Sequence, residues 1–308
     1  MRLPPLALLA LAALALLLAA PWVIYPAFLM KALCFALFAA AFNLLLGYAG
    51  LLSFGHAAFF GGAAYVTAHA AKVWGWPPEL AILGGTLAAA LLGLAMGALA
   101  IRRQGIYFAM TTLALAQMLF FLFLQAPFTG GEDGIQGVPQ GRLLGLIDLG
   151  QPTSAYYAVL AIAALGHLAL YRIIHSPFGQ VLKAVRDNEA RARSLGYEVD
   201  RYKLTAFVLS ATLAGLAGGT KALVFQIATL ADVQWQMSGE VVLMTLLGGI
   251  GTVAGPAVGA FLSVGLESAL ATSGLPVAAV IGAVFIACVL VFRRGLVGEI
   301  GARLKIRI

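Results

Sequence analysis

The sequence predicts an all-α polytopic membrane protein with about ten transmembrane crossings, some broken or re-entrant, and with both termini in the cytoplasm. The 308 residues are 62% hydrophobic and only 10% charged, whereas a soluble domain carries about 25% charged residues. Apolar runs recur along the whole chain, and the basic residues gather between them. With so few polar side chains, lipid must cover most of the exterior, and we expect a single transmembrane domain over residues 1–308.

Each apolar run is a candidate crossing, because about 20 apolar residues span a hydrocarbon core of about 30 Å. The first run could be a cleavable signal peptide, but it continues through Tyr25 without a polar cleavage region, so we expect a retained helix. The run at 236–249 is short for a crossing. The runs lie at 6–25, 29–46, 54–71, 80–101, 106–125, 156–174, 204–226, 236–249, 254–271 and 277–292.

Basic residues predict the orientation of these runs, since Lys and Arg are enriched in cytoplasmic loops. Basic groups lie at 102–103, within 175–203 and in the tail after residue 292. Ten crossings from a cytoplasmic N-terminus place all three groups inside, whereas nine or eleven place one of them outside. The segment 175–203 then becomes a cytoplasmic loop and 126–155 an external loop. The net charge of +7 therefore reflects loop composition rather than nucleic-acid binding.

Two glycine-rich stretches interrupt the helical pattern, at 47–56 and at 248–256. Irregular backbone at membrane depth persists only where protein or a water-filled cavity covers it. Both stretches are therefore candidates for lining a pathway, although tight packing of an interfacial loop explains them equally well. The candidate lining residues are Asn43, Ser53 and His56 near the first stretch and Thr252 near the second. Each of the four can instead serve a structural hydrogen bond.

The glycines and cysteines predict close packing of helices and indicate neither a substrate nor a metal site. Glycines four residues apart allow helices to cross closely; they occur as Gly93 with Gly97, Gly215 with Gly219, and Gly251 with Gly255 and Gly259. Cys34 and Cys288 each lie inside an apolar run, and no metal-ligand spacing is present.

The loop 175–203 holds 10 of the chain's 31 charged residues, six basic and four acidic. Ser176 and Pro177 predict the start of a helix, and Gly196 predicts its end. Asp200 then becomes a candidate cap for the next transmembrane helix. Such a helix can lie on anionic lipid or dock on a soluble partner. Its mixed charges favour docking weakly.

One face of this predicted helix is apolar. Phe178, Leu182, Val185 and Ala192 share the face, and Glu189 interrupts it.

Four segments, in order along the chain, resemble the inner-membrane permeases of the branched-chain amino acid ABC importers, and the LivM type in particular. They are Asn43–Gly61 (NLLLGYAGLLSFGHAAFFG), Thr129–Pro139 (TGGEDGIQGVP), Ser176–Ala190 (SPFGQVLKAVRDNEA) with Leu195 and Gly196 beyond it, and Gly248–Ala260 (GGIGTVAGPAVGA). Together they span residues 43–260.

The resemblance implies a multi-pass permease of the bacterial inner membrane with no cofactor and no metal of its own. It implies a homologous second permease in a heterodimer, two ATPase subunits that hydrolyse ATP, and an external solute-binding protein. The third segment would be the helix that couples to an ATPase, and its residues would be Ser176, Pro177, Phe178, Gly179, Leu182, Arg186, Glu189, Leu195 and Gly196. The solute would be a branched-chain amino acid, although similar permeases import urea and short amides.

Two other classes compete with this interpretation. An ion-coupled secondary transporter of small solutes usually places an ionisable group in mid-membrane. Glu240 and Glu267 are the only carboxylates within the predicted runs, and both fall towards the outer ends. An intramembrane hydrolase would need more than the nearby Ser53 and His56, since neither an oxyanion site nor an orienting group is recognisable. We therefore expect no catalytic activity in this chain.

Overall fold

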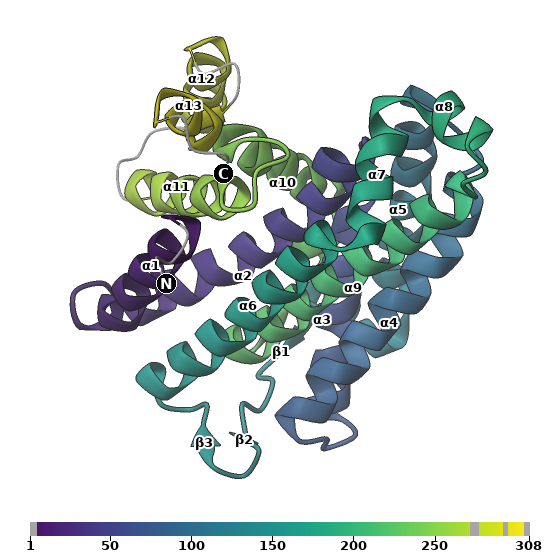
Figure 1. The fold of residues 1–308 in the computed structure, drawn as a ribbon. Helices are drawn as coiled ribbons and strands as arrows, with labels where there is room; N and C mark the ends of the chain where they lie inside the picture. The colour runs from purple at the N-terminus through teal and green to yellow at the C-terminus, as the bar shows by residue number, and fades with distance from the viewer. Residues whose placement is uncertain (1–4, 272–276, 292–294, 305–308) are drawn as a thin grey trace.

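The computed structural model describes residues 5–271, 277–291 and 295–304. In these residues the apolar runs form helices (Figure 1). The α-helices are α1 (Pro5–Ala19), α2 (Pro26–Asn43), α3 (His56–Lys72), α4 (Pro78–Ala100), α5 (Ile106–Gln125), α6 (Pro152–His175), α7 (Pro177–Asp187), α8 (Glu189–Ser194), α9 (Val199–Phe225), α10 (Trp235–Gly248), α11 (Gly255–Leu270), α12 (Val277–Val291) and α13 (Gly295–Leu304). Proline is the first residue of α2, α4, α6 and α7, where its missing N–H leaves no intrahelical bond unmade.

Short elements join these helices. They are η1 (Ala20–Trp22), the π-helix η2 (Leu44–Tyr48), η3 (Pro127–Thr129), η4 (Gly131–Asp133), η5 (Leu230–Asp232), and the strands β1 (Ile135–Gln136), β2 (Arg142–Leu143), β3 (Ile147–Asp148) and β4 (Ile227–Ala228).

Five helical segments of the described chain are long and apolar enough to cross a membrane, which makes the protein a multi-pass membrane protein. They are Pro26–Tyr48, Pro78–Ala100, Ile106–Gln125, Pro152–His175 and Val199–Phe225. Shorter apolar helices lie at Ala12–Trp22, Gly255–Leu270 and Ala279–Cys288. The short run expected at 236–249 is α10, whose 14 residues extend only about 21 Å.

The segment Pro26–Tyr48, α2 with η2, lies at the centre of the bundle. In its most apolar window 89% of the residues are buried, against 33–39% for α4, α5 and α6. α2 packs against α6, α9, α10 and α11, and α9 in turn packs against α3 and α4. The three helices α4, α5 and α6 therefore face lipid or another protein, while α2 and α9 form the core.

Small residues bring α4 and α9 close together, as the glycine spacing predicts. A Cβ added to Gly93 would lie 2.5 Å from the Cβ of Ala211, and one added to Gly215 would overlap the Cβ of Ala89. The backbones approach closely because none of these positions carries more than a methyl group.

The two ends of the bundle differ in structure. α7 and α8 lie at one end, and β2 and β3 lie at the opposite end (Figure 1). We call these the α7–α8 end and the strand end. At the strand end β1 pairs with β4, and β2 pairs with β3, both antiparallel. The chain is mostly helical, as expected, and its two-residue strands form short ladders beyond the helix ends, where they satisfy backbone groups.

The predicted breaks in the helical pattern are confirmed. The chain is irregular from residue 50 to residue 55, and α3 begins only at His56. The second break separates α10 from α11 between residues 249 and 254. Gly50 and Gly251 adopt positive φ angles of 71° and 75°, a conformation that most side chains avoid.

Candidate functional site

The segment at the α7–α8 end begins as the sequence predicts. The Oγ of Ser176 accepts a hydrogen bond from the N–H of Gly179 at 3.3 Å, which caps α7. A Cβ on Gly179 would overlap the carbonyl of Ile174, so only glycine fits this turn between α6 and α7. Leu182 and Val185 are buried beneath the helix, and the half-buried ring of Phe178 stacks on Tyr202 at 5.6 Å.

The expected single helix over 176–196 is two helices, because Asn188 ends one and caps the other. Asn188 has extended backbone angles, and its Oδ1 accepts the N–H of Arg191 at 2.9 Å. Asparagine favours such local bonds over a continued helix. Gly196, at φ 88°, lies just past the end of α8, as predicted. Leu195 is 70% exposed.

Glu189 holds this segment to the rest of the chain. Its carboxylate accepts bonds from Lys203 Nζ at 2.6 Å, Arg193 Nη2 at 3.0 Å and Gln104 Nε2 at 3.1 Å. Asp200 is not the cap of α9, since Glu198 occupies that position and Asp200 pairs with Arg193 in the first turn. The carboxylate that interrupts the apolar face is therefore bound within the chain.

Arg186 reaches from α7 to the first break. Its Nη1 donates to the carbonyl of Gly47 at 2.6 Å, and a Cβ on Gly50 would lie 2.8 Å from its Cγ. Lys183, one turn earlier, lies over the ring of Tyr48 at 5.5 Å. Two basic residues of α7 thus contact η2, the π-helical end of the central span.

Asn43 joins the first break to the second. Its Nδ2 donates to the carbonyl of Thr252 at 2.8 Å, and its Oδ1 accepts the N–H of Gly251 at 2.9 Å. Gly47 lies so close that a Cβ there would come within 2.6 Å of the Gly251 nitrogen. The Thr252 hydroxyl donates to the carbonyl of Gly249 and accepts the N–H of Gly255. Segments about 200 residues apart in sequence therefore form one junction with Arg186. We call it the coupling junction.

His56 and Ser53 lie deeper in the bundle. The hydroxyl of Ser210 donates to the carbonyl of Ala41 at 2.5 Å. Because that hydroxyl has one hydrogen, His56 Nε2–H is the donor in its 2.7 Å bond to Ser210. Ser53 accepts the N–H of Gly55. His56 and Ser53 are fully buried.

The structure therefore brings Asn43 and Thr252 together in the coupling junction and places His56 and Ser53 apart from them. All four form hydrogen bonds within the chain, so their role in lining a pathway stays a prediction.

A buried ion pair escaped the sequence analysis. Lys221 Nζ lies 2.5 Å from Asp232 Oδ1, with 14% and 3% of the two side chains exposed. Thr229 donates a further bond to Asp232 Oδ2 at 3.2 Å. Asp232 lies between two predicted runs, in η5, which folds back against α3. The sequence signal that could have revealed this pair is Lys221. It is the only cation inside the predicted run 204–226, and a cation within the membrane requires an anionic partner.

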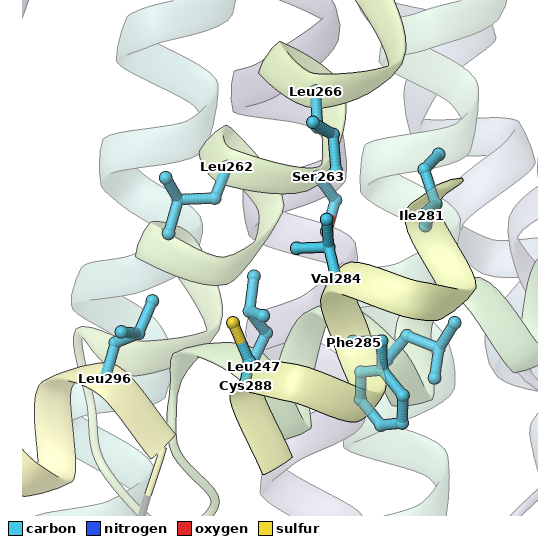
Figure 2. Close-up of a pocket in the computed structure, with 10 residues that line it drawn as sticks. Leu247, Leu262, Ser263, Leu266, Ile281, Val284, Phe285, Cys288 and Leu296 are labelled. Atoms are coloured by element: carbon cyan, nitrogen blue, oxygen red, sulfur yellow. The ribbon is translucent and has the colours of Figure 1, made fainter. Parts of the chain in front are cut away.

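An apolar cavity of about 230 Å³ lies between α10, α11, α12 and α13. Figure 2 shows side chains from all four helices around it. Leu243, Leu266 and Phe285 are among them, and Ser263 and Cys288 are its polar or polarisable members. The cavity is separate from the coupling junction. Among the described residues no group of three metal-ligating side chains is present.

Comparison with known proteins gives a consistent result. Residues 24–293 match the family described as branched-chain amino acid transport system / permease component. LivM of Escherichia coli K12, named as a high-affinity branched-chain amino acid permease protein, is 29% identical over 68% of this chain and 55% of its own length. LsrC of Klebsiella pneumoniae, an autoinducer 2 import permease protein, is 30% identical over 62% of this chain and 54% of its own.

A probable LivM of Methanocaldococcus jannaschii is 29% identical over 56% of this chain and 51% of its own length. The chain thus spans about half the length of the curated relatives it matches. The resemblance to LivM-type permeases that the four segments carry is confirmed, and the chain belongs to the branched-chain amino acid transport system permease family.

Proposed function

We propose that the chain is the permease subunit of an ATP-binding-cassette importer that carries branched-chain amino acids, or a similar small polar solute, across the bacterial inner membrane. The observation that carries the proposal is the coupling junction. A charged segment at one end of the bundle contacts, through Arg186 and Gly47, the place where two broken membrane segments meet. The family match adds the transport class, and the relatives named for two different solutes leave the solute open.

In the proposed arrangement the α7–α8 end faces the cytoplasm and the strand end faces outward. Both termini are cytoplasmic and the chain makes ten crossings, with α1, α3 and α10–α12 as the shorter ones. Lys183, Arg186, Arg191, Arg193, Arg201 and Lys203 all lie at the end assigned to the cytoplasm, in keeping with the excess of basic residues on that side of membranes.

The partners in this proposal are a homologous permease in a heterodimer, two ATPase subunits and an external solute-binding protein. The chain itself needs no cofactor or metal, because ATP is hydrolysed on the partner subunits. Closure of the ATPases would displace α7 and α8 and rock the two permeases between outward-open and inward-open states. The displacement would pass from α7 to the bundle through Arg186 and Asn43.

The surface that meets the ATPase is the side of α7 and α8 turned away from the bundle. Glu189 and Arg186 bind within the chain, so they are poor probes of docking. Leu195 is a better probe, since it is 70% exposed beside Tyr197, which is 40% exposed. An apolar side chain exposed among charges suits a hydrophobic anchor in a partner's groove.

The test is reconstitution of the full complex in proteoliposomes, with labelled leucine outside and ATP on the ATPase side. We expect uptake that requires both ATP and the binding protein. Leu195→Glu should reduce co-purification of the ATPase subunits and reduce uptake in parallel. The matched control is Leu146→Glu, a change at an 87% exposed leucine at the strand end, which should leave ATPase co-purification unchanged.

Two results would contradict the proposal. Uptake by this chain alone, driven by an ion gradient without ATPases, would establish a secondary transporter. Full co-purification of the ATPases with Leu195→Glu would show that α7 and α8 do not form the docking surface. Uptake of another solute in place of leucine would retain the importer and change only its substrate.

A further inference from the structure

The exposed side of α10 carries an ionisable residue that the coupling junction does not use. Gln236 and Glu240 are exposed, and Leu243 and Leu247 follow on the same face at helical spacing. A Cβ built on the adjacent Gly239 meets no atom within 4 Å. In the described part of the chain Glu240 makes no hydrogen bond and no ion pair.

Along the length of the bundle, Glu240 lies away from the outer end, although its side chain is on the exposed side of α10. The preceding Ser238 is fully buried and accepts the N–H of Ala57 at 2.9 Å, at the start of α3. Further along α10, Thr245 donates to the carbonyl of Ala39 in the middle of the central span. Glu240 therefore lies between two positions that contact the bundle centre, deeper than the sequence predicts.

Lipid is a poor covering for this face. A carboxylate at membrane depth is costly unless it faces water, protein or a counter-ion. The nearest charges are already paired: Lys31 with Glu267 at 2.9 Å and Lys221 with Asp232. Because Lys31 and Lys221 are each bound to another carboxylate, neither is a dedicated counter-ion for Glu240.

The exposed face of α10 changes from polar to apolar one turn after Glu240. Leu243 and Leu247 line the apolar cavity, together with Leu266, the residue next to Glu267 (Figure 2). A site with a carboxylate above an apolar cavity is complementary to a small molecule that carries a positive charge and an aliphatic group. The carboxylate alone would suit any cation, and the cavity alone would suit any apolar group, so the complementarity depends on the two together.

We propose that this face of α10 lines the water-filled pathway of the importer, that Glu240 binds the ammonium group of the transported solute, and that the cavity beside Leu243 receives its aliphatic part. This inference rests on the proposed function. Transport through such a site needs a contact that forms and breaks, which a half-exposed carboxylate provides more readily than a buried ion pair.

The first test asks whether the face of α10 that carries Glu240 is accessible to water. Glu240→Cys in the assembled transporter should react with a charged, membrane-impermeant thiol reagent. The wild-type chain, with its native Cys34 and Cys288, gives the background. Leu87→Cys is the matched control, since Leu87 is 62% exposed in the middle of α4 and should stay unlabelled. A residue 240 thiol that is no more reactive than the control overturns the inference.

The second test uses labelled leucine as the probe and measures leucine taken up per ATP hydrolysed. Glu240→Gln should lower this ratio about tenfold or more, the factor expected when a hydrogen bond to a charged group is weakened. Glu240→Asp should restore most of the loss. A purely structural defect would lower uptake and ATP hydrolysis together and leave the ratio unchanged, which would overturn the assignment.

The two proposals fail in different ways. A wild-type complex that takes up no leucine with ATP contradicts the proposed function, and the labelling at residue 240 then decides alone whether the face is wet. A wild-type complex that transports leucine while Glu240→Gln keeps its uptake ratio contradicts only the role of Glu240.

Discussion

The chain folds back into the bundle at both ends, and the two ends are held by different chemistry. At the α7–α8 end the coupling junction consists of hydrogen bonds between the side chains of Asn43 and Arg186 and backbone groups. At the strand end η5 is held by the ion pair of Lys221 and Asp232, which is almost completely buried. The bond from Arg186, whose side chain is 39% exposed, can be exchanged for water. Separating buried charges costs several kcal/mol.

The comparison assigns a different role to each end. The contact between α7 and the coupling junction can rearrange when α7 is pushed, because the bond from the half-exposed Arg186 to the Gly47 carbonyl can be exchanged for water. The strand end is suited to stay fixed, because η5 joins α9 to α10 and its ion pair anchors both. In the mechanism proposed above, the α7–α8 end would be the movable end and the strand end the fixed end. The predictions below test whether the difference is real.

The largest effect is expected at the fixed end. Asp232→Leu leaves Lys221 charged and unpaired in a nonpolar environment, which should lower the free energy of unfolding by about 3–5 kcal/mol. Unfolding in detergent or steric trapping in bicelles would measure this. The double variant Lys221→Met with Asp232→Leu should recover most of the loss.

The exposed ion pair of Arg201 and Glu198 is the matched control, with 81% and 60% of the side chains exposed. Glu198→Gln should change the free energy of unfolding by less than about 1 kcal/mol. Equal losses for Asp232→Leu and Glu198→Gln would show that burial does not distinguish the two pairs.

A smaller effect is expected when the coupling junction loses its amide. Asn43→Leu removes the partners of the Gly251 N–H and the Thr252 carbonyl, which should lower the free energy of unfolding by about 1–3 kcal/mol. The control is Thr111→Val, which removes a bond to the carbonyl of Tyr107 in its own helix at an exposed position. That change should stay within about 0.5 kcal/mol. An Asn43→Leu protein as stable as the control would mean that the two breaks are not held together by this side chain.

The difference between the two ends also explains what the sequence could and could not predict. Runs of apolar residues are local signals, so the helices and both breaks followed from composition alone. Ser176 and Gly196 marked the limits of the α7–α8 segment for the same reason, since a cap and a left-handed glycine act on adjacent backbone. Sequence analysis therefore predicted correctly the features that depend on interactions between residues close together in the sequence.

Contacts between residues far apart in the sequence could not be predicted in this way. Asn43 and Gly251 are more than 200 residues apart, and no periodicity connects them. Asn188 was overlooked because a polar residue within a charged helix looks ordinary until its side chain is seen to cap α8. Asp232 lay outside every apolar run, so its burial depended on the path of η5 rather than on its own neighbourhood. The placement of charged partners was therefore the least predictable part of the site.

Arg186 should show the smallest effect on stability and a distinct effect on coupling. Its side chain is 39% exposed, and Arg186→Gln should lower the free energy of unfolding by less than about 1 kcal/mol. If the bond to Gly47 transmits the movement of α7, the same change should still lower leucine uptake several-fold while ATP hydrolysis continues. The control is Arg191→Gln on α8, whose side chain is exposed and which should retain the uptake ratio. Loss of ATP hydrolysis and uptake together would instead place Arg186 in the ATPase contact, and the movable end would then lie in the docking surface rather than at the junction with η2.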